Sequence, residues 1–153
     1  MLYAQNTKVR LMKGPYEQSA SGFTSEVCDT IGYDYCQILF LAGTMDGATS
    51  VLQVKECDTT GGSYTTFSNE HGVFGLGESG QKNVDSTTSA DPSSSNNLIY
   101  GFEIDLKDRK RFLKIAGTAD DVNDQAIVAI LSRGRDIQPD SLSLRGFAGL
   151  IRA

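Results

Sequence analysis

The chain has 153 residues and a formal net charge of −5, with a sequence pI near 4.8. An acidic chain lacks the cationic field that phosphate groups require, so we expect no binding to nucleic acid or to an anionic membrane surface. No apolar stretch approaches the ~20 residues of a membrane-spanning helix, and the first residues do not resemble a signal peptide. The length suits one domain, and we expect residues 1–153 to form it.

The N-terminal part carries weak strand patterns. Residues Lys8–Met12 alternate loosely between polar and apolar side chains and are followed by Gly14 and Pro15. This pattern predicts an extended N-terminal segment or an edge strand. A second short strand is predicted at Phe23–Cys28.

Two stronger strand patterns follow. Tyr33–Ala42 is predicted to be a strand, and the second half of it is apolar on both faces. Such a segment is typical of a strand that is central in a sheet or packed on both sides. Val51–Glu56 alternates with a period of two residues. Because Asp46 and Gly47 favour a tight turn, we expect these two strands to form a hairpin.

Residues 57–97 differ from the rest of the chain because Gly, Ser, Thr and Asn make up more than half of them. A polar segment of this length inside a compact domain is usually functional or mobile. We expect short strands near Tyr64–Phe67 and Val73–Leu76, with the remainder projecting outward as a long Gly/Ser/Thr-rich insertion.

The last strand patterns lie between residues 98 and 132. Leu98–Leu106 alternates over its whole length, and a polar link joins it to the apolar run Arg111–Ala116. This arrangement predicts a β-hairpin with one buried face. Ala126–Ser132 is rich in β-branched residues and apolar on both faces, which indicates a central strand.

Residues 134–153 are predicted to form a C-terminal arm. Apolar residues recur in it at mixed spacing, as in a short amphipathic helix or an extended segment. A segment this short does not form a stable structure by itself. We therefore expect it to dock on its own domain or on a neighbouring subunit. With seven or eight short strands and no long helix, the fold class is all-β: a single-domain β-sandwich or jelly roll.

Few residues offer chemistry. His71 is the single histidine, and Glu70 beside it would point to the opposite face of a strand, so we expect a solvated loop histidine. Residues 120–124 are rich in carboxylates but lack the glycine and the bidentate Glu of a calcium loop, which favours a solvated acidic turn. We therefore expect no catalytic residue, no cofactor and no metal site, and the chain is not predicted to be an enzyme.

Cys28, Cys36 and Cys57 form an odd set without the spacing of a redox or zinc motif. We interpret them as free thiols in a reducing compartment, at least two of them packed as small hydrophobic residues. A single disulfide stays open as an alternative, because the sequence does not indicate which pair would form it.

Basic residues gather in two places. Arg109, Lys110 and Arg111 are adjacent in the polar link, and Arg133 and Arg135 follow the last predicted strand. Each group could be a solvated turn. Alternatively, it could make an electrostatic contact with an acidic partner protein, which would steer docking more than it adds affinity.

Two blocks of strand residues resemble a known family. The blocks consist of Asp29–Tyr35 with Leu52–Asp58, and of Phe102–Leu106 with Arg109–Leu113 and Ala129–Arg133. Together they resemble small proteins of tailed bacteriophages that are encoded near the major capsid protein and decorate, or cement, the head. The resemblance spans residues 29–58 and 98–133, under half of the chain, and it contains no catalytic motif.

The resemblance implies a β-sandwich that acts as a structural virion protein. Such a protein is made in the host cytoplasm, binds the assembled head lattice on the capsid surface and stabilises it. Its partner would be the major capsid protein, and it would commonly be a homotrimer. The residues that we expect to contact the capsid or a neighbouring subunit are Arg109, Lys110, Arg111, Arg133, Arg135, Leu142, Leu144 and Phe147.

Two other functions fit the sequence less well. The first is a β-sandwich receptor- or glycan-binding module of a phage fibre or tail, with Tyr64, Phe67 and Phe74 as its aromatic contacts. The second is a small enzyme or nucleotide-binding protein that uses His71, Cys36 or the acidic turn.

Overall fold

The computed structural model describes residues 7–66, 71–74, 82–84 and 96–132. Within these ranges the chain forms β-strands and no helix, and therefore no helix that could cross a membrane. The strands are β1 (Lys8–Gln18), β2 (Gly22–Thr24), β3 (Cys28–Asp29), β4 (Tyr35–Met45), β5 (Thr49–Cys57), β6 (Thr65–Thr66), β7 (His71–Phe74), β8 (Lys82–Val84), β9 (Leu98–Asp105), β10 (Phe112–Ala119) and β11 (Asn123–Ser132).

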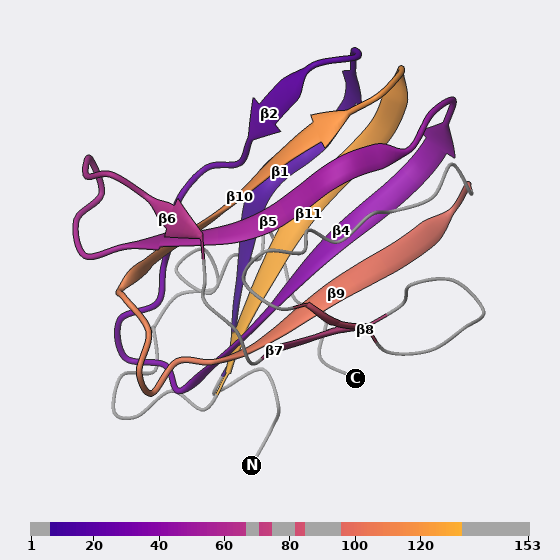
Figure 1. Ribbon diagram of the computed structural model, residues 1–153. Coiled ribbons are helices and arrows are strands. Elements are labelled where there is room, and N and C mark those ends of the chain that lie inside the picture. Colours follow the sequence, from indigo (N-terminus) through magenta and orange to yellow (C-terminus); the bar gives the residue numbers. More distant parts are fainter. Residues whose placement is uncertain (1–6, 67–70, 75–81, 85–95, 133–153) are drawn as a thin grey trace, which may run out of the picture.

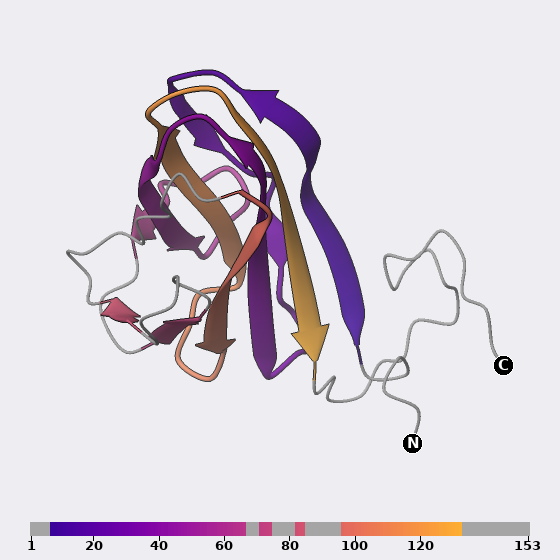
Figure 2. The same ribbon diagram turned by 90° about the vertical axis from the view of Figure 1, so that its right-hand side faces the viewer.

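The strands form two antiparallel sheets (Figure 1). One sheet has six strands in the order β1-β11-β4-β9-β7-β8. The other follows the order β2-β10-β5-β6, with β3 also paired to β10. Seen edge-on in Figure 2, the sheets are two layers that face each other. The predicted all-β sandwich is therefore confirmed.

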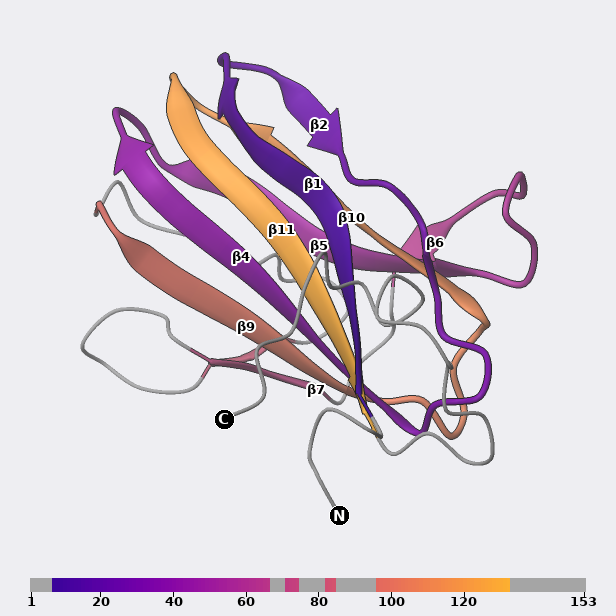
Figure 3. The same cartoon turned by 180° about the vertical axis from the view of Figure 1, so that it is seen from behind.

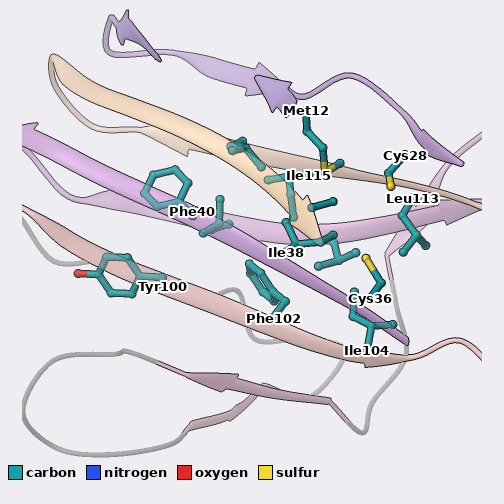
Figure 4. Packing of buried hydrophobic residues seen from close by; sticks show 14 of the residues in the cluster. Met12, Cys28, Cys36, Ile38, Phe40, Tyr100, Phe102, Ile104, Leu113 and Ile115 are labelled. Carbon is teal, nitrogen blue, oxygen red and sulfur yellow. The ribbon is translucent and has the colours of Figure 1, made fainter. Parts of the chain in front are cut away.

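The core lies between the two layers, because alternate residues of the long strands point inward. In β4, the side chains of Cys36, Ile38 and Phe40 are completely buried, whereas their neighbours are only partly buried. Figure 4 shows these side chains packed against residues of the opposite sheet. The ring of Phe40 contacts that of Tyr100 on β9, with centroids 6.2 Å apart and the rings tilted. This geometry is one that aromatic pairs prefer.

Three predicted strand positions are confirmed. The segment at Tyr33–Ala42 forms β4, and that at Ala126–Ser132 forms β11, which lies between β1 and β4 inside the six-stranded sheet. Lys8–Met12 belongs to β1, an edge strand, as predicted. The strand continues past Pro15, because register shifts between Leu11 and Tyr16 keep β1 alongside β11. Proline is tolerated at such irregular edge positions.

Both predicted hairpins are wrong. The strands exist, but β4 lies in the six-stranded sheet and β5 in the other, and β9 and β10 are separated in the same way. Each turn therefore carries the chain from one layer to the other. Period-two alternation shows only that a strand buries one face. Two strands that face each other across a core produce this pattern as well as two hydrogen-bonded neighbours do.

The less regular segments agree only in part with the predictions. The strand expected at Phe23–Cys28 is split into β2 and β3, both of which pair with β10. Within residues 57–97, β6 and β7 lie where short strands were expected, and β8 is an addition. Most of the remaining insertion, and the C-terminal arm at residues 134–153, lie outside the described residues.

Candidate functional site

The basic cluster Arg109–Arg111 lies in the connection between β9 and β10. Arg109 Nη1 is 3.8 Å from Glu56 Oε1, and Lys110 Nζ is 3.9 Å from Asp58 Oδ2. The backbone N–H of Lys110 also donates a hydrogen bond to Glu56. Because the Arg109 and Glu56 side chains are mostly buried, this pair fixes the connection against the end of β5.

Arg111 has the best-aligned ion pair of the cluster. Its Nε and Nη2 atoms donate to the two carboxylate oxygens of Asp29 at 2.8 and 2.7 Å. This hydrogen-bonded guanidinium lowers the pKa of Asp29 below its ordinary value. Thr30 donates its hydroxyl to the Arg111 carbonyl, which further ties the β3 end to β10. All three cations of the cluster are therefore balanced by carboxylates of the same chain.

The Asp29–Arg111 pair predicts a pH dependence of stability. A carboxyl group with a lowered pKa in the folded state stabilises the fold above its unfolded pKa, near 3.9, and the contribution disappears as the pH falls through the lower, folded value. We expect Asp29→Asn to unfold at lower urea concentration than the native chain at pH 7, with the difference shrinking below about pH 4. Arg111→Gln should behave in the same way. A constant difference at all pH values would contradict this role of the pair.

The other candidate contact residues, Arg133, Arg135, Leu142, Leu144 and Phe147, lie outside the described residues.

The acidic turn at residues 120–124 has a structural role in the described part of the chain. Asp121 Oδ1 accepts a hydrogen bond from the Val122 N–H at 2.8 Å. The buried Asn123 accepts one from the N–H of Gly47 at 3.3 Å. The turn between β10 and β11 is thereby joined to the turn between β4 and β5. Among the residues that the structure describes, no three His, Cys, Asp or Glu side chains gather as metal ligands would.

The other candidate residues are scattered. His71 begins β7, which pairs with β8 and β9. Cys36 is buried in the core. Of the aromatic candidates, Tyr64 carries the ammonium group of Lys114 over its ring, 4.1 Å from the centroid. Phe67 lies outside the described residues, and Phe74 is in β7, whose side chains are not described.

A continuous apolar surface lies on strands β1, β11, β4 and β9 of the six-stranded sheet, on the side that faces away from the core. The register places Leu11, Val128 and Leu39 in one row across three neighbouring strands, because directly paired residues point to the same side. The same register places other aliphatic residues in the rows beside it. Figure 3 shows the four strands β1, β11, β4 and β9 side by side from behind. We call this surface the outer face; it consists of Val9, Leu11, Leu39, Leu41, Ile99, Ala126, Val128 and Ile130.

The outer face is unusual for a sheet that borders on solvent. An antiparallel sheet with one solvated side normally alternates apolar residues inside with polar residues outside. Here Leu11 and Ile99 are 54% and 56% exposed, and the other six side chains are partly exposed. Polar residues lie at its two ends: Tyr35 donates a hydrogen bond of 2.8 Å to Glu103 at one end, and the exposed residues Glu17 and Asp124 are paired at the other. A contiguous apolar patch of this kind marks an interaction surface more often than a free one.

A groove adjoins the outer face at its β1 edge. Its volume is about 380 Å³, and Leu11 belongs to both surfaces. The groove is lined by Leu11, Met12, Lys13, Gly14, Thr24 and Glu26.

No protein-family model and no curated protein sequence matches this chain. Among solved structures, the chain is similar to the SPBc2 prophage-derived protein YomS, with 9% identity, a TM-score of 0.49 and coverage of 82% of this chain and 92% of that one.

Two larger structures are also similar. One is that of infectious bursal disease virus, Gx strain, with 10% identity, a TM-score of 0.41 and coverage of 86% of this chain and 34% of that one. The other contains the CBM22-1 and GH10 modules of Clostridium thermocellum xylanase 10B, with 10% identity, a TM-score of 0.35 and coverage of 91% and 28%. At these values the likenesses identify neither a family nor an activity.

Reasoning from the sequence did not identify the outer face as a candidate site. The signal was present in two separate segments, since both Tyr33–Ala42 and Ala126–Ser132 are apolar on their two sides. That pattern by itself indicates only central or doubly packed strands. The structure adds that the second apolar sides of β4 and β11 lie next to each other and continue onto β1 and β9.

Proposed function

We propose that this chain is a structural virion protein that decorates an assembled phage head, binds its lattice and stabilises it. The resemblance of residues 29–58 and 98–133 to head decoration proteins suggests this role, and the apolar outer face is the observation that carries it. A protein that attaches to the outside of a shell needs a broad surface for contact more than an enclosed cleft. The occupant of the outer face would be the exterior of the lattice formed by the major capsid protein.

Burial of aliphatic side chains supplies the affinity in this proposal. Removing apolar surface from water contributes about 25 cal/mol per Å², so a contact over part of the outer face suffices for weak binding. Several copies that act together, as in a homotrimer on a three-fold axis, would raise the avidity of such weak contacts. Binding to the assembled lattice and not to free subunits would stabilise the shell by mass action.

The basic cluster at residues 109–111 has a secondary role in the proposal. Its cations are already paired with Asp29, Glu56 and Asp58, so a partner gains little affinity from them. The two exposed pairs, Lys110–Asp58 and Arg111–Asp29, would instead set the register and salt dependence of a contact at its rim.

Sedimentation with purified heads tests the proposed function. The chain should sediment with empty assembled heads and remain in the supernatant with dissociated capsid protein. Cryo-electron microscopy of the virion should then place its density on the outside of the head. No binding to heads, or density only on the tail, would rule the proposal out.

A further inference from the structure

Two buried thiols face each other across the core. Cys28 lies on β3 of the five-stranded sheet and Cys36 on β4 of the six-stranded sheet. Both side chains are completely buried. Figure 4 shows their sulfur atoms turned toward one another in the space between the sheets. A hydrogen bond between the two thiols lowers the pKa of Cys28 and raises that of Cys36.

We propose that Cys28 and Cys36 form an inter-sheet disulfide when the protein meets a low-molecular-weight disulfide such as oxidised glutathione. The Cys28 thiolate attacks one sulfur of the oxidant, which forms a mixed disulfide and releases one glutathione thiol. Cys36 then attacks the Cys28 sulfur and releases the second glutathione. Two protein thiols are thereby oxidised, one glutathione disulfide is reduced, and the protein loses two hydrogen atoms.

The architecture explains why Cys28 reacts first. Its strand, β3, has only two residues and two register pairs with β10, at Leu113 and Phe112. Less of the sheet therefore has to open to expose Cys28 than to expose Cys36. Cys36 is held in an eleven-residue strand that is paired on both sides. The lowered pKa of Cys28 agrees with this order, because the thiolate is the attacking species.

Cys57 is not part of the pair. It ends β5 and pairs across the ladder with Phe112, and its sulfur lies 4.0 Å from the Thr59 hydroxyl. Cys57 is not among the groups that shift the pKa of Cys28 or of Cys36. The structure thus selects one pair from the three that the sequence left open.

A disulfide here would fasten the two layers of the sandwich to each other. Since the link closes only the short loop between β3 and β4, the gain in stability should be modest. A consequence for the virion rests on the proposed function: the protein would assemble with reduced thiols inside the cell and become cross-linked after release. The chemistry of the pair does not depend on that function.

Oxidation of the purified native chain tests the inference without heads. After incubation with oxidised glutathione, the intact mass should fall by two hydrogen atoms. Trypsin leaves both cysteines in one peptide, residues 14–55, because no Lys or Arg lies between Lys13 and Lys55. Further cleavage before Asp29 and Asp34 should release fragments that stay joined until a reductant is added. The unfolding temperature should rise by roughly 5–10 °C in the oxidised form.

Variants separate the pair from the third cysteine. Cys57→Ala should retain the link, whereas Cys28→Ala and Cys36→Ala should lose it. If both thiols stay reduced, if a glutathione adduct persists on either of them, or if the link involves Cys57, the inference is wrong. The native chain alone gives these results, so the conclusion does not depend on whether the core variants fold.

Discussion

Replacing Leu11 or Ile99 by aspartate is expected to weaken binding to empty heads by roughly 10–100-fold. Both side chains lie on the outer face, on strands at opposite sides of β4 and β11, and both are more than half exposed in the free protein. A contact with the lattice would bury the new carboxylate, and a buried charge without a partner is strongly unfavourable. Sedimentation at a series of protein concentrations measures the change.

The matched control is Ile31→Asp. Ile31 is 61% exposed and lies in the connection between β3 and β4, outside the strands that form the outer face. Its replacement by aspartate changes the net charge by the same amount as the two outer-face variants do. It should bind heads like the native chain, and all three variants should have unfolding temperatures close to the native value. Equal loss of binding in Ile31→Asp would indicate a general charge effect, and full binding by both outer-face variants would exclude the outer face as the contact surface.

The second large effect is expected in the core. Ile38→Ala should lower the free energy of unfolding by about 2–5 kcal/mol, because Ile38 is completely buried and its removal leaves a cavity between the sheets. Leu39→Ala, at the next residue, removes a side chain from the partly exposed outer face and should lower it by about 1 kcal/mol or less. Urea denaturation of both variants measures the difference.

The two residues are isomers on adjacent positions of one strand, so they form a stringent pair. A slip of β4 by one residue would exchange their environments. Equal losses of stability, or a greater loss in Leu39→Ala, would therefore contradict both the register of β4 and the definition of the outer face.

The two candidate surfaces differ in how far the sequence could predict them. Arg109, Lys110 and Arg111 are adjacent in the chain, so their clustering was predictable, but their partners Asp29 and Glu56 are more than fifty residues away. The outer face, in contrast, could not be predicted from neighbouring residues in the chain. Leu11 and Val128 are directly paired although more than a hundred residues separate them, and no local pattern joins them.

The sequence by itself determined where the long strands lie and, where polar and apolar residues alternate, which of their faces is buried, because the alternation of Leu52 and Val54 with Gln53 and Lys55 is a local property of extended chain. Only the tertiary structure decided which strands are neighbours, and hence the separation of β9 from β10, the outer face and the meeting of Cys28 with Cys36. The physical reason is that pairing depends on the free energy of both sheets closing over one core, a sum over contacts between distant residues that no short stretch of chain contains.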